Sequence, residues 1–184
     1  QLEYSFRRGL MRTYETFGVC TRQALEYTCS YLDAELTPDQ RMTMMAEYQR
    51  LPAFDDVEQS LAGLKSAGYS LYAFSNGAAD AVETLLVAAD IRELFDGVVS
   101  VDDRKTFKPN PDVYEHLLDI TASSPDNAWL MSSNPFDVIG AISYGLRAAW
   151  VQRSKNAIFD PWGIEPTLRI TSLRELATGI SSPN

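Results

Sequence analysis

AWLMSSNPFDVIGAISYGLRAAWV, residues 128–151, places two short apolar runs on either side of a helical pattern. The runs at residues 128–131 and 148–151 are continuous and apolar, which is typical of strands buried on both faces. Between them, residues 138–144 carry apolar side chains at helical spacing. Strand, helix and strand in this order indicate a parallel sheet covered by helices, and therefore the α/β class.

The same alternation of helix and strand extends back to about residue 55. Asp56-Val57-Glu58-Gln59 predicts a helix start and Gly68 the end of that helix, because glycine readily adopts the left-handed conformation beyond a helix. Further strands are expected at residues 70–74 and 98–101. Helical patterns separate the strands, with apolar residues at Val82, Leu85 and Leu86, and at Tyr114, Leu117 and Leu118.

Residues 1–54 contain helical patterns and no strand pattern. Leu10, Tyr14 and Phe17 recur at helical spacing, and Leu25, Cys29 and Leu32 follow them. Thr37-Pro38-Asp39-Gln40 predicts another helix start, since threonine caps free N–H groups, proline fits the first turn and glutamine bonds back to the cap. Leu51-Pro52 is expected to end that helix. The chain thus divides into a helical part, residues 1–54, and an α/β part, residues 55–184.

The composition indicates a folded protein without affinity for nucleic acid. Apolar residues make up 45% of the 184 residues and the formal net charge is −9, whereas binding to a phosphate backbone needs a basic surface. No apolar run reaches the roughly 18 to 20 residues that cross a bilayer, and no signal-peptide pattern opens the chain. We therefore expect a soluble, cytoplasmic protein with no nucleic-acid or membrane partner.

Cys20 and Cys29 lie in a helical pattern and form no disulfide framework. We expect structural thiols, because buried free cysteine usually behaves as a small apolar residue. The chain begins at Gln1, without an initiator methionine and inside a helical pattern. We therefore expect a fragment of a longer protein.

Polar residues follow three of the expected strands. Ser75-Asn76 follows the first, Lys108 lies shortly after the second, and Ser132-Ser133-Asn134 follows the third. Ligands of open α/β sheets bind beyond the carboxyl ends of the strands, so these loops form a candidate site. Each loop also has an ordinary reading, as a helix cap for Ser75, Asn76 and Asn134 or as a solvated surface lysine for Lys108.

The residue types in these loops suit an anionic substrate. N–H groups at the helix start after Ser75-Asn76-Gly77 favour a carboxylate or phosphate. Lys108, which precedes Pro109-Asn110-Pro111, can neutralise carboxylates and position a water. Asn134 can donate hydrogen bonds to an anion. Asp137, in the first turn of the next helix, can pair with Lys108 or simply favour that helix start.

Two further polar residues lie on the helix after Lys108. Tyr114, near the helix start, is either a hydroxyl donor or a core residue. His116, the only histidine, lies on a different face of that helix, and we expect it at the surface.

Together, these loops resemble the later motifs of the haloacid dehalogenase superfamily, and the chain is similar to its L-2-haloacid dehalogenases from Gln1 to about Leu176. The matching segments are Gln1-Leu2-Glu3-Tyr4 for the early cap helix, Phe74-Ser75-Asn76-Gly77 for the second motif, Lys108-Pro109 for the third, and Ser132-Ser133-Asn134 with Asp137 for the fourth. The resemblance implies a Rossmann-like core with a parallel sheet over residues 55–184 and an N-terminal helical cap over residues 1–54.

The fourth motif decides between branches of this superfamily, most of whose members are phosphatases. Phosphatases carry Asp-Asp or Gly-Asp there ahead of a later Asp, which holds Mg²⁺ through oxygen ligands. This chain has Ser132-Ser133-Asn134 at that place, which leaves only Asp137. The resemblance therefore implies a 2-haloacid dehalogenase with no metal and no cofactor, and a phosphohydrolase of the same fold is the alternative.

The implied reaction is hydrolytic dehalogenation of L-2-haloalkanoic acids to D-2-hydroxy acids through an aspartyl ester. By resemblance, Ser75 and the backbone at Asn76 bind the substrate carboxylate. Lys108 neutralises and orients the nucleophile, supported by Tyr114 and Ser132.

The resemblance implies roles for the remaining residues as well. Asp137, with Lys108, orients or activates the hydrolytic water, and Asn134 stabilises the departing halide. The apolar pocket around C2 is walled by Leu2, Phe17 and Phe136.

In such enzymes the first motif, with its nucleophilic aspartate, would lie before Gln1. Asp102 and Asp103 follow a strand but fall in the run-up to the third motif, so they do not replace it. We therefore expect the natural protein to extend further at its N-terminus and this chain to be inactive by itself. A non-catalytic remnant of the fold is the other alternative.

The resemblance also implies a homodimer. Met42, Met44 and Met45 lie in a predicted cap helix and fit a subunit interface. The core is the more ordinary place for such methionines, and we expect them there.

Overall fold

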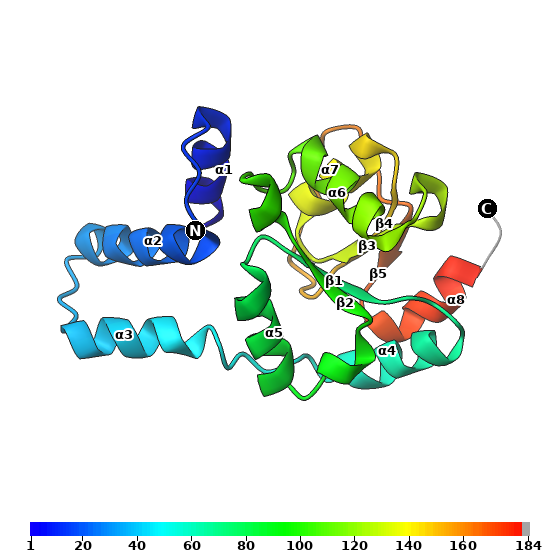
Figure 1. The fold of residues 1–184 in the computed structure, drawn as a ribbon, viewed down its shortest axis with the longest axis horizontal. Coiled ribbons are helices and arrows are strands. Elements are labelled where there is room, and N and C mark those ends of the chain that lie inside the picture. The colour runs from blue at the N-terminus through cyan, green and yellow to red at the C-terminus, as the bar shows by residue number, and fades with distance from the viewer. Residues whose placement is uncertain (182–184) are drawn as a thin grey trace. The chain divides into compact units, whose positions relative to one another are not determined.

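The computed structural model describes residues 1–181 and is an α/β protein, as predicted (Figure 1). Its helices are α1 (Leu2–Met11), α2 (Phe17–Tyr31), α3 (Pro38–Glu47), α4 (Val57–Ser66), α5 (Ala79–Ala88), α6 (Pro111–Thr121), α7 (Pro135–Tyr144) and α8 (Leu176–Ser181). Its strands are β1 (Tyr72–Ser75), β2 (Gly97–Ser100), β3 (Trp129–Ser132), β4 (Arg147–Val151) and β5 (Leu168–Ile170). Short 3₁₀ helices are η1 (Arg92–Leu94), η2 (Val101–Arg104), η3 (Pro125–Asn127) and η4 (Leu173–Glu175). None of the helices in residues 1–181 is both long and apolar enough to span a membrane.

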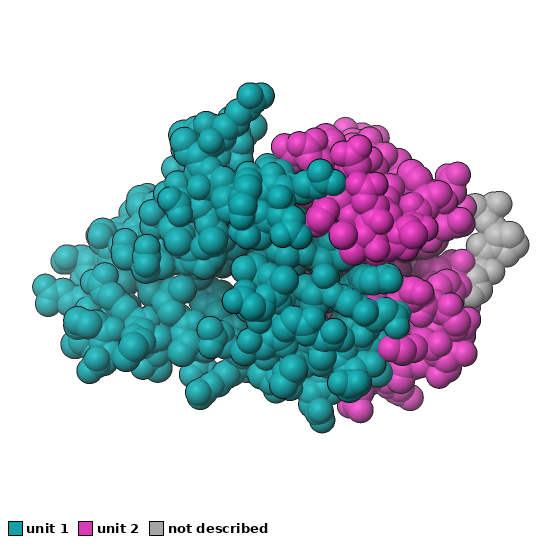
Figure 2. Space-filling view, viewed as in Figure 1, with its two compact units in different colours: residues 1–53, 72–107 teal, residues 54–71, 108–184 magenta. Residues whose placement is uncertain are grey.

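The chain forms two compact units (Figure 2). The first contains residues 1–53 and 72–107, and the second contains residues 54–71 and the chain from residue 108 onward. The predicted boundary at residue 54 between a cap and a core is a functional division that these units do not test, so it stays a prediction.

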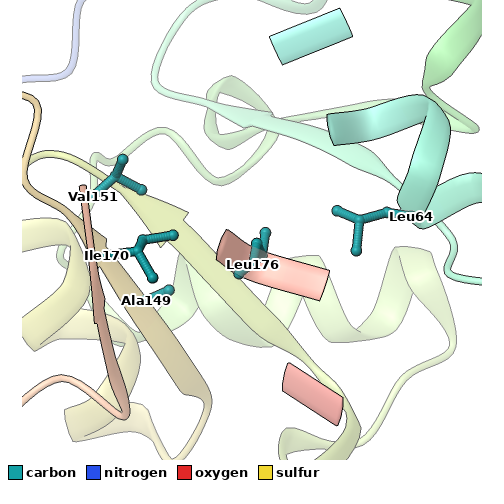
Figure 3. Packing of buried hydrophobic residues seen from close by; sticks show 5 residues of the cluster. All are labelled: Leu64, Ala149, Val151, Ile170 and Leu176. Carbon is teal, nitrogen blue, oxygen red and sulfur yellow. The ribbon is translucent and has the colours of Figure 1, made fainter. Parts of the chain in front are cut away.

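The second unit is built on the parallel sheet β3-β4-β5, in which β4 is the central strand. Residues 148–151 of β4 are all buried, as expected for a strand whose two faces are covered. On one face, α4 and α8 pack through Leu64 and Leu176 against Ala149, Val151 and Ile170 (Figure 3). α7 packs against β3 and β4, and α6 packs against α7.

The first unit contains the parallel pair β1-β2, with Phe74 opposite Val99. α5 connects the two strands and packs against both, which makes a strand–helix–strand crossover. α1 and α2 pack against each other. α3, every residue of which is described, has no buried residue.

The four strands expected from the sequence are confirmed within two residues at each end. Gly68 has φ +90, so it ends α4 as predicted. The capping box at α3 is also confirmed, since Thr37 and Gln40 exchange hydrogen bonds of 3.2 and 2.8 Å. β5 and α8 carry no prediction, because three and six residues are too few for a periodic pattern.

The helical pattern through Leu10, Tyr14 and Phe17 is wrong as a single helix. α1 ends at Met11, because Arg12 adopts the left-handed conformation with φ 56. α2 begins afresh at Phe17, where the Thr16 side chain accepts a hydrogen bond from the N–H of Val19. Leu10 is consequently 86% exposed. α3 likewise ends at Glu47, before the expected Leu51-Pro52.

Two burial predictions are wrong. Met42 and Met44 are 67% and 46% exposed, so they are not core residues, and Met45 is only half-buried, because no residue of α3 is fully buried. His116 is buried, because α6 buries a broad face that includes both its neighbours in the turn, Val113 and Leu117.

Cys20 and Cys29 are free thiols buried in α2, as expected for structural cysteines. Burial raises the pKa of the Cys20 thiol, which keeps it in the protonated, less reactive form.

Asp56 ties three segments of the second unit together at the start of α4. Its Oδ2 accepts hydrogen bonds from Arg153 (2.6 Å), from the Ser172 hydroxyl (2.8 Å) and from the N–H of Leu173 (2.7 Å). Burial by itself would raise the pKa of this carboxyl, but the hydrogen bonds lower it to about 2. Arg153 also lies over the Phe54 ring, 4.4 Å from its centroid. Asp56 is therefore a charged anchor for the ends of β4 and η4.

Gly140 allows α7 to approach α6 closely. A Cβ at this position would lie 2.2 Å from Tyr114 Oη and 2.5 Å from Pro109 Cβ. Real side chains do not adopt such distances, so a larger residue must displace both neighbours.

We predict that Gly140→Ala lowers the free energy of unfolding by about 1–3 kcal/mol, because it overpacks this contact. Gly63→Ala is the matched control, since Gly63 also lies within a helix but a Cβ there would meet no atom within 4 Å. The control should gain about 0.5–1 kcal/mol from helix propensity. Urea denaturation of both variants measures the difference, and equal effects at the two glycines would contradict the packing argument.

Candidate functional site

Lys108 and Asp137 form a buried ion pair in the second unit. Lys108 Nζ lies 3.0 Å from Asp137 Oδ2, across 29 residues of sequence. The two residues are only 8% and 4% exposed. The predicted pairing is confirmed, and the reading of Lys108 as a solvated surface lysine is wrong.

Local structure fixes both members of this pair. Asn110 caps α6 by accepting a hydrogen bond from the N–H of Asp112 at 2.9 Å, and Pro111 occupies the first turn. Lys108 is therefore held just ahead of a well-defined helix start. Asp137 lies in the first turn of α7, where the helix dipole favours a negative charge.

Tyr114 contributes both to the core and to this pair. It is fully buried, and its hydroxyl donates to the backbone oxygen of Asp137 at 3.3 Å. Burial, together with the charge of Asp137, raises the pKa of the Tyr114 hydroxyl. The hydroxyl therefore stays protonated and remains a donor.

The second carboxylate oxygen of Asp137, Oδ1, is buried and has no hydrogen-bond partner within residues 1–181. Asp56 Oδ1 is in the same condition, but Oδ2 of Asp56 is fully engaged in joining three segments. A buried carboxylate oxygen without a donor is costly. Beside a lysine and a polar loop, the free lone pairs of Asp137 can accept a proton or a hydrogen bond from a small polar molecule.

The loop after β3 is fixed from two sides. Ser132 Oγ accepts a hydrogen bond from the N–H of Asn134 at 3.1 Å. The buried Trp150 donates from its indole N–H to the backbone oxygen of Ser133 at 3.1 Å. Asn134 is the residue before α7, but its side chain makes no capping hydrogen bond and is exposed. Asn134 therefore occupies the N-cap position of α7, but without the side-chain hydrogen bond that the capping reading implies, and its amide is available to a ligand.

The loop after β1 lies in the first unit and is held through Gly77. Ser75 Oγ accepts a hydrogen bond from the N–H of Gly77 at 3.0 Å, and Ser100 Oγ donates to the backbone oxygen of Gly77 at 2.7 Å. Asn76 is buried. α5 begins with Ala78 as its N-cap, so the capping reading of Ser75 and Asn76 is wrong.

Ser100 was missed by sequence reasoning. The signal was a hydroxyl at the end of the apolar run of residues 98–101, but a serine there is equally common at any strand end.

The predicted apolar residues lie on three helices. Leu2 is half-buried on α1, Phe136 is half-buried in the first turn of α7, and Phe17 packs against Phe107 with ring centroids 6.2 Å apart.

The structure thus assembles two groups of predicted residues. Lys108, Asp137 and Tyr114 meet in the second unit, next in sequence to the loop of Ser132 and Asn134, and Ser75 and Asn76 form the loop in the first unit. That all of them serve one reaction stays a prediction. Residues 1–181 contain no group of three or more His, Cys, Asp or Glu side chains placed to hold a metal ion.

Comparison with known proteins identifies the relatives of this chain. Residues 10–151 match the family of haloacid dehalogenase-like hydrolases. The chain is 35% identical over 174 residues to an (S)-2-haloacid dehalogenase of Pseudomonas sp. (strain YL), and the aligned region covers 95% of this chain and 75% of that protein. It is 39% identical over 153 residues to an (S)-2-haloacid dehalogenase of Xanthobacter autotrophicus, and the aligned region covers 83% of this chain and 60% of the relative.

A solved structure agrees in fold over the whole chain. It is the L-2-haloacid dehalogenase from Xanthobacter autotrophicus with chloropropionic acid covalently bound, with a TM-score of 0.92 and 31% identity. The match covers 100% of this chain and 83% of that one.

We predict that Asp137→Leu lowers the free energy of unfolding by about 3–5 kcal/mol, because it removes the carboxylate that pairs with the buried Lys108 charge. Adding Lys108→Met should recover part of this loss, since the double variant buries no charge at this place. Glu165→Gln is the control, because it breaks an exposed pair with Arg169 and should cost less than about 1 kcal/mol. Urea denaturation measures all four proteins, and a double variant less stable than Asp137→Leu would contradict the argument.

Proposed function

Since the chain belongs to the haloacid dehalogenase-like hydrolases and, within them, to the L-2-haloacid dehalogenases, we propose that it hydrolyses L-2-haloalkanoic acids to D-2-hydroxy acids. The observation that carries this proposal is the buried Lys108–Asp137 pair with one open carboxylate oxygen. The polar loop beside it in sequence offers hydroxyl and amide groups, and no second carboxylate.

The proposed reaction has two steps. A carboxylate attacks C2 of the substrate from the side opposite the halogen, which forms an ester, releases halide and inverts the carbon. Water then attacks the ester carbonyl, which frees the hydroxy acid and restores the carboxylate. The nucleophile in this proposal is the aspartate expected in the first motif, and its absence from these 184 residues stays a prediction.

Lys108 neutralises and orients the nucleophile in this proposal. A cation held beside a reacting carboxylate lowers the pKa of that group and keeps it ionised. The Tyr114 hydroxyl, through the backbone of Asp137, steadies the pair. Ser132 supports the same group through the loop that it shares with Asn134.

Asp137 orients the hydrolytic water. Its Oδ2 is held by Lys108, while Oδ1 is buried and has no hydrogen-bond partner within residues 1–181, so its lone pairs are unused. A buried carboxylate with one open oxygen suits a base that takes a proton from an attacking water.

The remaining residues bind the substrate. Ser75 and the backbone of Asn76 hold its carboxylate, and the exposed amide of Asn134 stabilises the departing halide. An apolar wall of Leu2, Phe17 and Phe136 accepts the substituent on C2. We also propose that residues 1–54 act as a cap that excludes water from the first step. A cytoplasmic location stays a prediction.

We predict chloride release from L-2-chloropropionate, with D-lactate as product and undiminished in the presence of EDTA, by a protein that carries the first motif. Lys108→Met should lower the rate by about a hundredfold or more, because the charge acts on the reacting groups. Lys155→Met, at an exposed lysine of the same unit, should leave the rate unchanged.

Mg²⁺-dependent cleavage of a phosphate ester with no release of chloride would contradict the proposed dehalogenase function. The 184-residue chain assayed alone tests the separate expectation that the first motif is needed. Chloride release by that chain would contradict it.

We further propose a homodimer that uses the exposed apolar residues of α2 and α3. Tyr31, Leu32 and Met42 are more than 60% exposed, and apolar side chains of this size gain free energy when a partner subunit covers them. Sedimentation velocity should give twice the 20.5 kDa of the chain, and Met42→Glu should shift the protein toward the monomer. A monomer at micromolar concentration before any substitution would contradict the proposal.

A further inference from the structure

A chain of hydrogen bonds in the first unit links the turn between α1 and α2 to the loop after β1. The Tyr14 hydroxyl, in that turn, donates to Asp102 Oδ1 across 88 residues of sequence. The backbone N–H of Asp102 donates to Ser100 Oγ at 3.1 Å. The Ser100 hydroxyl in turn donates to the backbone oxygen of Gly77 at 2.7 Å. Each of the two hydroxyls donates to one acceptor, so the donor and the acceptor of every hydrogen bond in the series are defined.

Charge stabilises the first link of this chain. Lys105 Nζ lies 2.9 Å from Asp102 Oδ2 and 5.3 Å from the centroid of the Tyr14 ring. The hydrogen bonds from Tyr14 and then from Lys105 lower the pKa of Asp102, which keeps it ionised. Burial, and then the bond to Asp102, raise the pKa of Tyr14, which keeps its hydroxyl protonated. A neutral donor and a charged acceptor make a hydrogen bond stronger than a neutral pair.

Aromatic packing holds the same segment from its other side. The rings of Tyr14 and Phe107 are stacked with centroids 5.1 Å apart, and Phe17 packs against the same ring. Gly9 of α1 passes close by, because a Cβ there would lie 3.5 Å from Thr106 Oγ1. Residues 101–107 are therefore fixed against both helices of the pair and the turn between them.

Gly77 is the receiving end of the chain and is held at both of its backbone groups. Its N–H donates to Ser75 Oγ and its oxygen accepts from Ser100. A Cβ at this position would lie 3.3 Å from Val82 and 3.4 Å from Ser75 Oγ, which leaves little room for another orientation. Anion binding by backbone N–H groups depends on their direction, so a small rotation here weakens it.

We propose that Ser100, Asp102 and Tyr14 are positioning residues that set the Ser75-Asn76-Gly77 loop for the carboxylate of the substrate. This inference rests on the function proposed for that loop. None of the three residues is assigned a contact with substrate. They act through Gly77, so that the turn between α1 and α2 determines how tightly the loop binds an anion.

The first test measures amide hydrogen exchange of residues 75–79 without any ligand. Ser100→Ala should speed exchange there by about tenfold, the effect of losing one hydrogen bond in a buried network. Tyr14→Phe removes only one oxygen and keeps the stacked ring, and it should act in the same direction by about threefold. Tyr69→Phe, at an exposed tyrosine of the second unit, is the matched control and should change nothing.

The second test measures kcat and KM for L-2-chloropropionate in a protein that carries the first motif. Ser100→Ala should raise KM by about tenfold with kcat within about twofold, because the loop binds the carboxylate in both ground and transition states. Asp102→Asn keeps an acceptor for the Tyr14 hydroxyl, so its KM for L-2-chloropropionate should rise less than that of Asp102→Ala.

Three outcomes decide the proposal. Faster exchange at residues 75–79 in both Ser100→Ala and Tyr14→Phe, with a raised KM, supports it. Unchanged exchange in both variants overturns it, as does a loss of kcat at constant KM, which would indicate only a smaller folded fraction. If the parent protein releases no chloride, the proposed function fails, while the exchange measurement still decides whether the hydrogen-bond chain holds the loop.

Discussion

The buried ion pair of Lys108 and Asp137 imposes the strongest constraint on the second unit. Burying either charge without the other costs several kcal/mol, so both must reach the same place in every folded molecule. α6 and α7 must therefore begin at fixed points and pack closely, which Gly140 permits. The buried strand β4 packs against α7, and α7 in turn packs against α6. The packing of this unit and the chemistry of its polar residues thus follow from one requirement.

Asp56 and Asp137 show how similar buried carboxylates differ in use. Asp56 Oδ2 accepts three hydrogen bonds from two segments distant in sequence, which makes it an anchor for the chain. Asp137 Oδ2 is held by a single lysine, and its other oxygen faces no donor within the described chain. The first arrangement gives rigidity, and the second leaves one carboxylate oxygen with unused hydrogen-bonding capacity. Burial is the same in both, so the number and origin of the donors make the difference.

The first unit applies the same principle through backbone groups. Ser100 connects Gly77 to Asp102, and Tyr14 connects Asp102 to the turn between α1 and α2. Apart from Gly77, every residue in this series of hydrogen bonds lies far in sequence from the loop that the series holds. The position of this loop is therefore set by residues from two distant segments, the turn at Tyr14 and residues 100–102. Such support is common around binding sites, because a loop alone has too few contacts to fix its own N–H groups.

The α/β class, four strands, the capping box of α3 and the pairing of Lys108 with Asp137 could be predicted from the order of the residues alone. The class, the strands and the capping box are local or periodic features. The pairing was expected from the opposite charges of the two side chains. The burial of His116, the exposure of Met42 and the link from Ser100 to Gly77 could not be predicted in this way and depend on the folded arrangement. Each of these depends on which face of an element meets a segment far away in the chain. Apolar spacing records that an element has a buried face, but the partner of that face, and the hydrogen bonds between them, are set by packing in three dimensions.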